Sequence, residues 1–530
     1  MTSPTTTLDL VDTDPAELAV DALVIGVHSQ DGSADGDAAG AAAGAGPALL
    51  LATGAESIAV AFEGKLTETL ALLGATGAAG EVVKLATLGT IGPPLLVAVG
   101  LGPEPSGAAP APETLRRAAG CAVRALAGTG RVALVLPVPD DADGPAALRA
   151  VAEGALLGSY RFAGYKTRPQ PGRRRPVGSV AVHVTDATEP AAQAEVARAR
   201  AVTAAVMAGR DWVNMPPNEL RPPTFADAVQ AAAGAAGLDV TVLDEQALAD
   251  GGYGGVLAVG GGSAAPPRLV IISYTPEGGP VADRPRVALV GKGITFDTGG
   301  VSIKPSQGMW EMKSDMAGAA AVGAAMLAIA ALKPSVAVTA YLPMAENMPS
   351  GTAYRPGDVI TMFNGKRVEV LNTDAEGRMV LADAIARACA DGCDYLLETS
   401  TLTGGQVVAL GKRIAGVMGT DELCARLKAT GEAVGEPIWP MPLPEDVRKG
   451  MESEVADICQ VNSAMDRAGH MLQGGVFLRE FVTEPVAWAH LDIAGPAYHS
   501  GEPTGYWSKG GTGVPVRTLV QLVQDIADNG

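Results

Sequence analysis

The stretch Asn372-Thr373-Asp374-Ala375-Glu376-Gly377-Arg378 carries the strongest signal in this chain. If the segment is extended, side chains two positions apart point to the same side, so that Asp374, Glu376 and Arg378 project together. Two adjacent carboxylates repel each other unless cations lie between them. The stretch therefore predicts a metal site, with a guanidinium group that faces whatever anion the metals attract.

Candidate partner ligands lie upstream of this stretch. Lys292 and Asp297 follow an apolar run at 286–290 that predicts a strand, and Asp315 is expected to open a helix. Functional sites in open α/β sheets form beyond the carboxyl ends of strands. We therefore expect these side chains to meet the 372–378 stretch at one edge of a sheet.

The charges of this group predict what it binds. Its four carboxylates belong to Asp297, Asp315, Asp374 and Glu376. Two divalent cations would balance them, and carboxylate oxygens suit Mg, Mn and, less selectively, Zn. None of the five histidines lies between residues 292 and 378, which argues against a histidine-type zinc site. The pattern favours a carboxylate-bridged centre with two metals roughly 3.5–4 Å apart.

The sequence resembles the leucyl aminopeptidase (cytosol aminopeptidase) family, in its bacterial form, whose signature reads NTDAEGR. The resemblance covers roughly residues 195–530. Beyond the signature, it rests on the spacing of Lys292, Asp297, Lys304, Asp315, Asp374, Glu376 and Arg378, and on the blocks 353–358, 401–404 and 488–495. It implies a metalloexopeptidase, a hydrolase that releases N-terminal residues, leucine among them, from peptides.

The resemblance also implies how the metals are held. Asp297 and Glu376 would bridge both ions. Lys292 and Asp315 would complete the tighter site, and Asp374 would complete the other through its side chain and its backbone carbonyl. A lysine ligand must be neutral, although its ordinary pKa is about 10.4. Two adjacent dications disfavour the charged form of Lys292 and make this reasonable. Mn or Zn are the expected metals, with Mg and Co as alternatives.

The same resemblance implies the chemistry. A water bridging the metals would be the nucleophile, because metal binding can lower its pKa from about 15.7 to near 7. Lys304 would stay protonated and stabilise the oxyanion. Arg378 cannot act as a base, since its pKa exceeds about 12, and it would instead hold a bicarbonate that shuttles the proton. The substrate's free amine would bind the second metal and Asp315, so peptides with a blocked N-terminus should be poor substrates.

Substrate contacts and assembly follow from the resemblance as well. Met312 and the loop 401–404 would border the pocket for the first side chain. The full substrate-binding set is then Lys292, Asp297, Lys304, Met312, Asp315, Asp374, Thr401, Leu402 and Gly404. The family forms homohexamers with the catalytic domains turned inward, and we expect that assembly here.

Length and patterning predict two α/β domains. The chain of 530 residues is too long for one compact core. We expect a smaller N-terminal α/β domain over 1–190, a connecting helix over 191–212, and a larger catalytic α/β/α domain with a central mixed sheet over 213–530. An Ala/Gly tract at 37–46 reads as a flexible insertion. Expected strands lie at 22–27, 95–100, 132–136, 286–290, 336–342 and 394–398, and expected helices at about 315–332 and 379–391.

Composition bears on partners and compartment. The net charge of −19 repels phosphate backbones and anionic lipid, which argues against nucleic acid and membrane partners. Five scattered cysteines fit a reducing compartment. The first residues lack the basic start and apolar stretch of a secretory signal. The uncharged segment 316–332 is short of a full membrane span and reads as a buried core helix. We expect a cytoplasmic protein.

Three other functions stay open at this point. The fold could serve a DNA-binding regulator, although the net charge of −19 counts against it. The chain could be an inactive structural relative, although all seven functional residues are present. The same metal cluster could also serve a dipeptidase that acts on cysteinyl-glycine.

Overall fold

The computed structural model of the protein describes residues 6–30, 49–106, 109–168, 172, 174–279 and 284–530. The Ala/Gly tract at 37–46 lies outside the described residues. The chain divides into two compact units. The first comprises Met1–Thr203 and Gly501–Lys509, and the second comprises Ala204–Ser500 and Gly510–Gly530.

The first unit is an α/β layer built on a seven-stranded sheet, in the order β1-β7-β6-β2-β5-β4 with β3 paired to β2. The three strands expected from apolar runs are present as β2, β5 and β6. The strands are β1 (Thr7–Val11), β2 (Ala22–Ser29), β3 (Leu49–Leu51), β4 (Val82–Ala86), β5 (Leu95–Pro103), β6 (Arg131–Val135) and β7 (Ser179–His183). The helices are η1 (Pro15–Glu17), α1 (Glu56–Ala61), α2 (Leu66–Leu72), α3 (Pro112–Ala125) and α4 (Gly144–Ser159).

A late segment, Gly501–Lys509, groups with the first unit. The division expected from sequence placed it in the catalytic domain over 213–530, so the compact units differ from that division at these residues. The reason is a specific contact with α3. Tyr506 donates a hydrogen bond from its hydroxyl to Glu113 Oε1 at 3.0 Å. Gly120 permits this approach, because a Cβ there would lie 2.8 Å from the Tyr506 backbone.

A long helix, α5 (Pro190–Asn214), contains the predicted connecting segment 191–212 and passes from the first unit into the second. The second unit contains a nine-stranded sheet in the order β17-β16-β19-β15-β10-β12-β9-β8, with β11 paired to β12. Its strands are β8 (Asp239–Leu243), β9 (Arg268–Tyr274), β10 (Arg286–Gly291), β11 (Gly293–Asp297), β12 (Ala337–Asn347), β15 (Tyr395–Ser400), β16 (Ala415–Gly419), β17 (Ile438–Pro440) and β19 (Ala487–Asp492).

The central sheet is mixed, as expected. Strands β12, β10, β15 and β19 are parallel neighbours, whereas β9 pairs antiparallel with β12, and β16 with β19. Smaller strands are β13 (Val359–Thr361), β14 (Arg367–Glu369), β18 (Ile458–Cys459), β20 (Tyr498–His499) and β21 (Gly510–Gly511). Strands β13, β14 and β18 form a separate three-stranded sheet.

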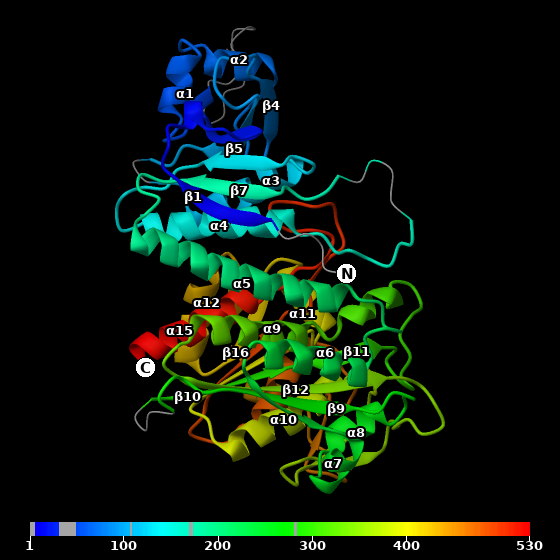
Figure 1. Ribbon diagram of the computed structural model, residues 1–530. Coiled ribbons are helices and arrows are strands. Elements are labelled where there is room, and N and C mark those ends of the chain that lie inside the picture. Colours follow the sequence, from blue (N-terminus) through cyan, green and yellow to red (C-terminus); the bar gives the residue numbers. More distant parts are fainter. Residues whose placement is uncertain (1–5, 31–48, 107–108, 169–171, 173, 280–283) are drawn as a thin grey trace. The chain divides into compact units, whose positions relative to one another are not determined.

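Helices cover both faces of the central sheet (Figure 1). On one face lie α6 (Pro222–Ala235), α9 (Ala317–Leu332) and α15 (Val516–Asn529), and on the other α8 (Gly254–Gly260) and α10 (Gly377–Asp391). The predicted α/β/α catalytic domain is therefore confirmed. The remaining helices are α7 (Glu245–Asp250), η2 (Met309–Ser314), α11 (Gly404–Leu410), α12 (Asp421–Val434), α13 (Glu445–Lys449) and α14 (His470–Arg479).

The uncharged helix α9 is a core helix, as its sequence predicts. Among the described residues, one helical segment, Met309–Leu332, is long and apolar enough to cross a membrane, and 78% of its most apolar window is buried inside the protein. Helix α9 packs on β10, β12 and β15. Its apolar surface is thus covered by the sheet and by neighbouring helices.

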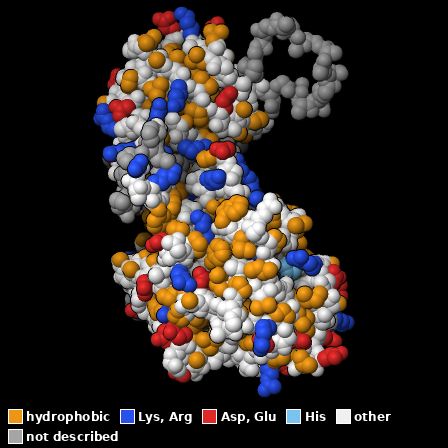
Figure 2. Space-filling view, turned by 90° about the vertical axis from the view of Figure 1, so that its right-hand side faces the viewer, with side chains coloured by type: hydrophobic (Ala, Val, Ile, Leu, Met, Phe, Trp, Pro, Cys, Tyr) orange, Lys and Arg blue, Asp and Glu red, His pale blue; other side chains and the backbone are white. Residues whose placement is uncertain are grey.

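Charged side chains of both signs are interspersed over the face seen in Figure 2. Hydrophobic side chains lie between them at many places on this face.

Candidate metal centre

Lys292 and Asp297 are positioned by the ends of neighbouring strands. Lys292 directly follows β10, and Asp297 is the last residue of β11. The backbone of Lys292 is held on both sides, since its N–H donates to Thr399 O at 3.1 Å and its carbonyl accepts from Ala319 N at 2.8 Å. These bonds tie the lysine to the end of β15 and the start of α9. Lys292 and Asp297 therefore lie at the sheet edge that the sequence predicts.

The signature stretch is a turn followed by a helix and not an extended segment, so the condition under which Asp374, Glu376 and Arg378 would project to one side by alternation is not met. Asn372 explains the turn, because its side-chain oxygen accepts from Asp374 N at 3.0 Å and its carbonyl accepts from Ala375 N at 3.0 Å. Glu376 precedes α10 with helical backbone angles, φ −71° and ψ −37°. Gly377 opens the helix against Lys292, and a Cβ there would lie 2.6 Å from Lys292 Cε.

The structure nevertheless brings the predicted acids together. Asp297, Asp374 and Glu376 each offer a carboxylate oxygen within 4.8 Å of the others. Asp315 joins them through a shared lysine, since Lys292 Nζ lies 2.9 Å from Asp315 Oδ2 and 2.8 Å from Glu376 Oε1. A second lysine completes the cluster, since Lys304 Nζ lies 2.8 Å from Asp297 Oδ2 and 2.5 Å from Asp374 Oδ1. The cluster therefore contains four acids and two ammonium groups.

This donor set fits divalent cations. Glu376 is only 1% exposed, and its Oε2 has no hydrogen-bond partner. A buried carboxylate oxygen is costly unless a hydrogen bond or a cation compensates it. Carboxylate oxygens with one amine nitrogen suit hard or borderline dications. The unpartnered oxygen of Glu376 therefore points to a cation in the middle of the cluster.

Burial and mutual repulsion shift the pKa values of the acids. Burial raises the pKa of Asp297 to about 6, and the charge of Glu376 adds to the effect. Burial likewise raises the pKa of Asp315 and of Asp374. For Glu376, burial is outweighed by the two lysines, with Lys292 the stronger, and its pKa is lowered. Glu376 is thus the acid that most readily keeps its charge at the centre.

The lysines respond in the opposite sense. Burial disfavours the charge of Lys292, but Asp315, Glu376 and Asp297 outweigh burial and raise the pKa of the lysine. The ammonium group is the counter-charge of the cluster when no dication is bound. A neutral Lys292, which the family resemblance implies, therefore requires dications to take over that role.

Two side chains that the sequence analysis did not select hold the acids in place through hydrogen bonds. Asn347, the last residue of β12, is 0% exposed and donates from Nδ2 to Asp297 Oδ1 at 2.8 Å and to Thr373 O at 2.9 Å. Tyr354 donates from its hydroxyl to the same Thr373 carbonyl at 2.8 Å. A polar residue at the end of an apolar strand was the signal that could have identified Asn347.

The 401–404 loop borders the cluster on one side. Thr401 accepts from Lys292 Nζ through its carbonyl at 3.1 Å and donates from Oγ1 to Asp315 Oδ1 at 2.7 Å. Behind the loop, Asp492 accepts from Leu402 N at 3.2 Å and from Thr403 Oγ1 at 2.6 Å. Thr401 therefore touches the acids, and Asp492, which the sequence analysis did not select, anchors the loop.

The other expected pocket residues lie on adjoining elements. Met312 belongs to η2 and is half-buried, and Gly404 opens α11 at an exposed position. The side chain of Leu402 packs against α14, where a Cβ on Gly474 would lie 2.7 Å from Leu402 Cδ2.

Arg378 lies inside the first turn of α10 and is 1% exposed. Its Nη1 donates to the carbonyl of Gln460 at 2.6 Å, whereas its Nε has no hydrogen-bond partner. Burial lowers the pKa of Arg378 to about 10, and the charges of Glu376 and Asp492 oppose that shift. The guanidinium is therefore still protonated at neutral pH and has a buried N–H available for an anion.

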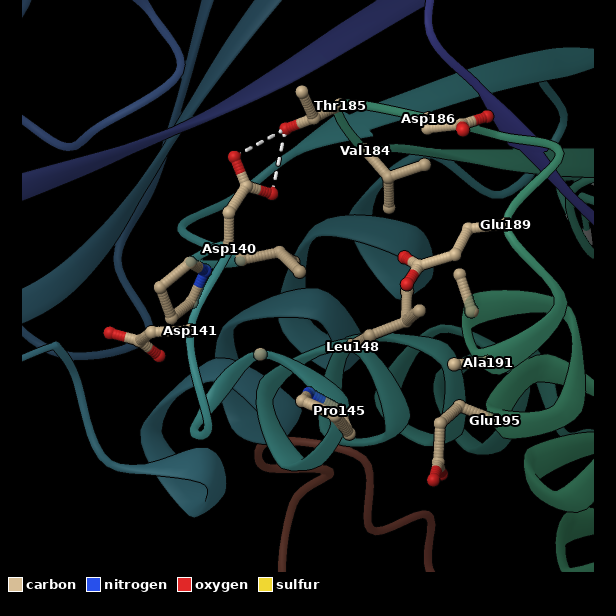
Figure 3. A pocket seen from close by; sticks show the side chains of 14 residues that line it. Asp140, Asp141, Pro145, Leu148, Val184, Thr185, Asp186, Glu189, Ala191 and Glu195 are labelled. Atoms are coloured by element: carbon tan, nitrogen blue, oxygen red, sulfur yellow. Dashed lines mark hydrogen bonds between the residues drawn. The ribbon is translucent and has the colours of Figure 1, made fainter.

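A separate cavity of about 310 Å³ lies in the first unit, between the ends of β6 and β7 and the helices α4 and α5 (Figure 3). Acidic side chains line part of it, and neighbouring groups engage several of them. Asp140 accepts from Thr185 Oγ1 at 2.8 Å, and Glu195 pairs with Arg149 at 2.6 Å. These acids stabilise the loops around the cavity and do not resemble the metal cluster.

Four acids and two lysines converge at the ends of parallel strands around a carboxylate oxygen that has no hydrogen-bond partner, which is the arrangement of a metal-dependent enzyme. Residues 207–520 match the catalytic domain of the cytosol aminopeptidase family, and residues 46–169 match its N-terminal domain. The chain belongs to this family. The match includes the N-terminal unit, beyond the 195–530 region in which the sequence motifs lie.

Similar proteins of known sequence span nearly the whole chain. A probable cytosol aminopeptidase of Streptomyces avermitilis is 48% identical over 528 residues, which cover 98% of each protein. A probable cytosol aminopeptidase of Rhodococcus jostii is 48% identical and covers 96% of each. These matches and the family domains make the chain a metal-dependent aminopeptidase.

Solved structures agree in fold. A mutant of tomato leucine aminopeptidase has a TM-score of 0.83 at 30% identity, with 99% of this chain and 97% of that chain covered. The bottromycin maturation enzyme BotP in complex with Mn has a TM-score of 0.79 at 36% identity, with 96% and 100% covered. Neither a DNA-binding regulator nor a cysteinyl-glycine dipeptidase receives support from these comparisons.

Proposed function

We propose that this aminopeptidase works with two divalent cations held by five side chains. Asp297 and Glu376 would bridge the ions, Lys292 and Asp315 would complete one site, and Asp374 would complete the other. The observation that carries this proposal is the buried, unpartnered Oε2 of Glu376 at the centre of four converging acids. Mn or Zn are the metals we favour, and the Mn bound by BotP supports the first.

When bound, the cations supply Lewis acidity and lower the pKa of a water molecule toward neutrality, so that it can attack a peptide carbonyl. The protein's own groups would complete the reaction. Lys304 Nζ lies within 2.8 Å of both Asp297 and Asp374, at the rim of the cluster, and would donate to the oxyanion as its charge develops. Its position beside the acids keeps it protonated.

Arg378 would hold an anion, bicarbonate in our proposal, that carries a proton between the water and the leaving amine. Its unpartnered buried Nε supports this role. A guanidinium cannot itself accept a proton at neutral pH, since burial lowers its pKa only to about 10. The arginine would therefore orient the proton carrier and leave the transfer to the bound anion.

Selectivity for free N-termini would come from the acids as well. The substrate's amine would lie between the cations and Asp315, whose Oδ1 is oriented by Thr401 Oγ1 at 2.7 Å. Met312, Thr401, Leu402 and Gly404 would border the first side chain of the peptide. We propose leucine among the accepted residues, by likeness to the tomato enzyme's name.

We further propose that the protein acts in the cytoplasm on peptides for catabolism and assembles as a homohexamer. The name of the similar cytosol aminopeptidases supports the compartment. Size measurement by light scattering tests the assembly directly. A monomer that is fully active would remove the hexamer from the proposal and leave the chemistry intact.

The decisive experiment combines activity with metal analysis. The purified protein is stripped with a chelator and then titrated with Mn²⁺ or Zn²⁺ while hydrolysis of free-amine aminoacyl amides is followed. We expect activity to be lost on stripping and to return as about two ions bind per chain. Saturation at one ion per chain with full activity would refute the two-cation proposal.

A further inference from the structure

Gln460 lies directly under the signature turn and is 0% exposed. Its side chain makes three hydrogen bonds to the backbone of that turn. Its Oε1 accepts from Leu371 N at 2.7 Å and from Asn372 N at 2.8 Å, and its Nε2 donates to Ala375 O at 3.3 Å. One amide therefore holds the backbone on both sides of Asp374.

The backbone of Gln460 is also engaged. Its carbonyl accepts from Arg378 Nη1 at 2.6 Å. Its N–H donates to Glu369 O at 3.0 Å and so continues the pairing of β18 with β14. The residue is thus fixed to the small three-stranded sheet, and from there it contacts both the turn and the arginine.

We propose that Gln460 is a positioning residue that sets the geometry of the metal-binding turn and the direction of Arg378. The turn carries Asp374 and Glu376 but has no strand partner of its own, so its shape depends on side chains that bond its backbone. A carboxamide suits this place, because it accepts two N–H groups and donates to one carbonyl at once. The inference rests on the proposed metal centre and adds a residue outside the ligand set.

The test measures metal affinity without substrate. Gln460→Met keeps the length of the side chain and removes all three hydrogen bonds. Loss of an outer-shell partner weakens metal binding about 10- to 100-fold, and we expect a loss of that size for Mn²⁺ in calorimetric titration of the stripped protein. Gln460→Glu still accepts from Leu371 N and Asn372 N, so its affinity should lie closer to that of the wild type.

The chain offers a matched control in Gln473, which is 2% exposed and also makes three side-chain hydrogen bonds to backbone. Its Oε1 accepts from Asn462 N at 3.1 Å, and its Nε2 donates to Asp466 O at 2.9 Å and Ala468 O at 3.0 Å. These bonds hold a loop that carries no proposed ligand. Gln473→Met should therefore lower thermal stability and leave Mn²⁺ affinity unchanged.

The outcomes separate three cases. Weaker Mn²⁺ binding by Gln460→Met, with Gln473→Met at the wild-type level, supports the inference. Equal Mn²⁺ affinity in all variants, or equal losses in both methionine variants, would overturn it. If Gln460→Met does not fold, Gln460→Glu takes its place in the test. An Mn²⁺ affinity of Gln460→Glu below that of Gln473→Met then supports the inference. An equal or higher affinity overturns it. A wild type that binds no Mn²⁺ or Zn²⁺ would instead refute the metal centre itself.

Discussion

Replacing Lys304 by alanine should separate metal binding from turnover. The ammonium group of Lys304 lies between two proposed ligands, 2.8 Å from Asp297 and 2.5 Å from Asp374, and its side chain is 23% exposed. Two effects of its removal oppose each other. The oxyanion would lose a donor, but the two acids would lose a competitor for the cations.

The sizes of these two effects predict the result of the metal-binding assay and of the kinetic assay. At an effective dielectric of about 20, each of these contacts is worth about 6 kcal/mol of gross attraction before desolvation. Cations that enter the cluster must replace that attraction, so Lys304→Ala should bind Mn²⁺ at least as tightly as the wild type. Removal of one preorganised oxyanion donor costs about 2.7–4 kcal/mol, or 10²- to 10³-fold in kcat. We therefore expect a fall in kcat with no loss of metal.

The assay measures kcat and KM for a free-amine aminoacyl amide in parallel with the metal content of the same sample. Lys428→Ala is the control, because it removes a lysine that pairs with Glu432 at 2.6 Å on the surface of α12. The control should change neither quantity. A Lys304→Ala variant that retains wild-type kcat, or that loses its metal along with its activity, would refute the oxyanion role as reasoned here.

Three further results are expected. Glu376→Gln removes the charge at the centre of the cluster, so metal content and kcat should both collapse, and near-normal turnover would contradict its bridging role. N-acetylated peptides should be cleaved far more slowly than free-amine peptides, and efficient cleavage would contradict binding through the amine. Burial raises the pKa of Asp383 to about 7 from an ordinary value near 3.8. The folded state therefore binds the proton of Asp383 more tightly than the unfolded state does. The contribution of this proton to the free energy of unfolding is complete below pH 4 and declines as the pH rises toward 7. Asp383→Asn should flatten that decline in urea unfolding between pH 4 and 7, and an unchanged slope would contradict the shift.

The layers of the fold were predictable because their signals are local. The apolar runs at 286–290 and 394–398 specify buried strands, and the uncharged 316–332 segment specifies a core helix, which the structure contains as β10, β15 and α9. The place of Gly501–Lys509 was not predictable in this way. It groups with the first unit and contacts α3, for example through Tyr506 and Glu113, which are separated by 393 positions.

The candidate site shows the same difference between residues that the sequence identifies and residues whose role depends on long-range contacts. Asp297, Asp315, Asp374 and Glu376 stand out in the sequence through the signature 372–378 and through spacings that resemble those of the cytosol aminopeptidase family. The stretch at Asn372 is a turn and not extended, and the acids still converge, because several backbone conformations can direct two carboxylates at one point. Gln460 and Asp492 carry no such signal. Each works through hydrogen bonds to a distant backbone, 371–375 for the first and 402–403 for the second, and these bonds exist only once the strands have paired.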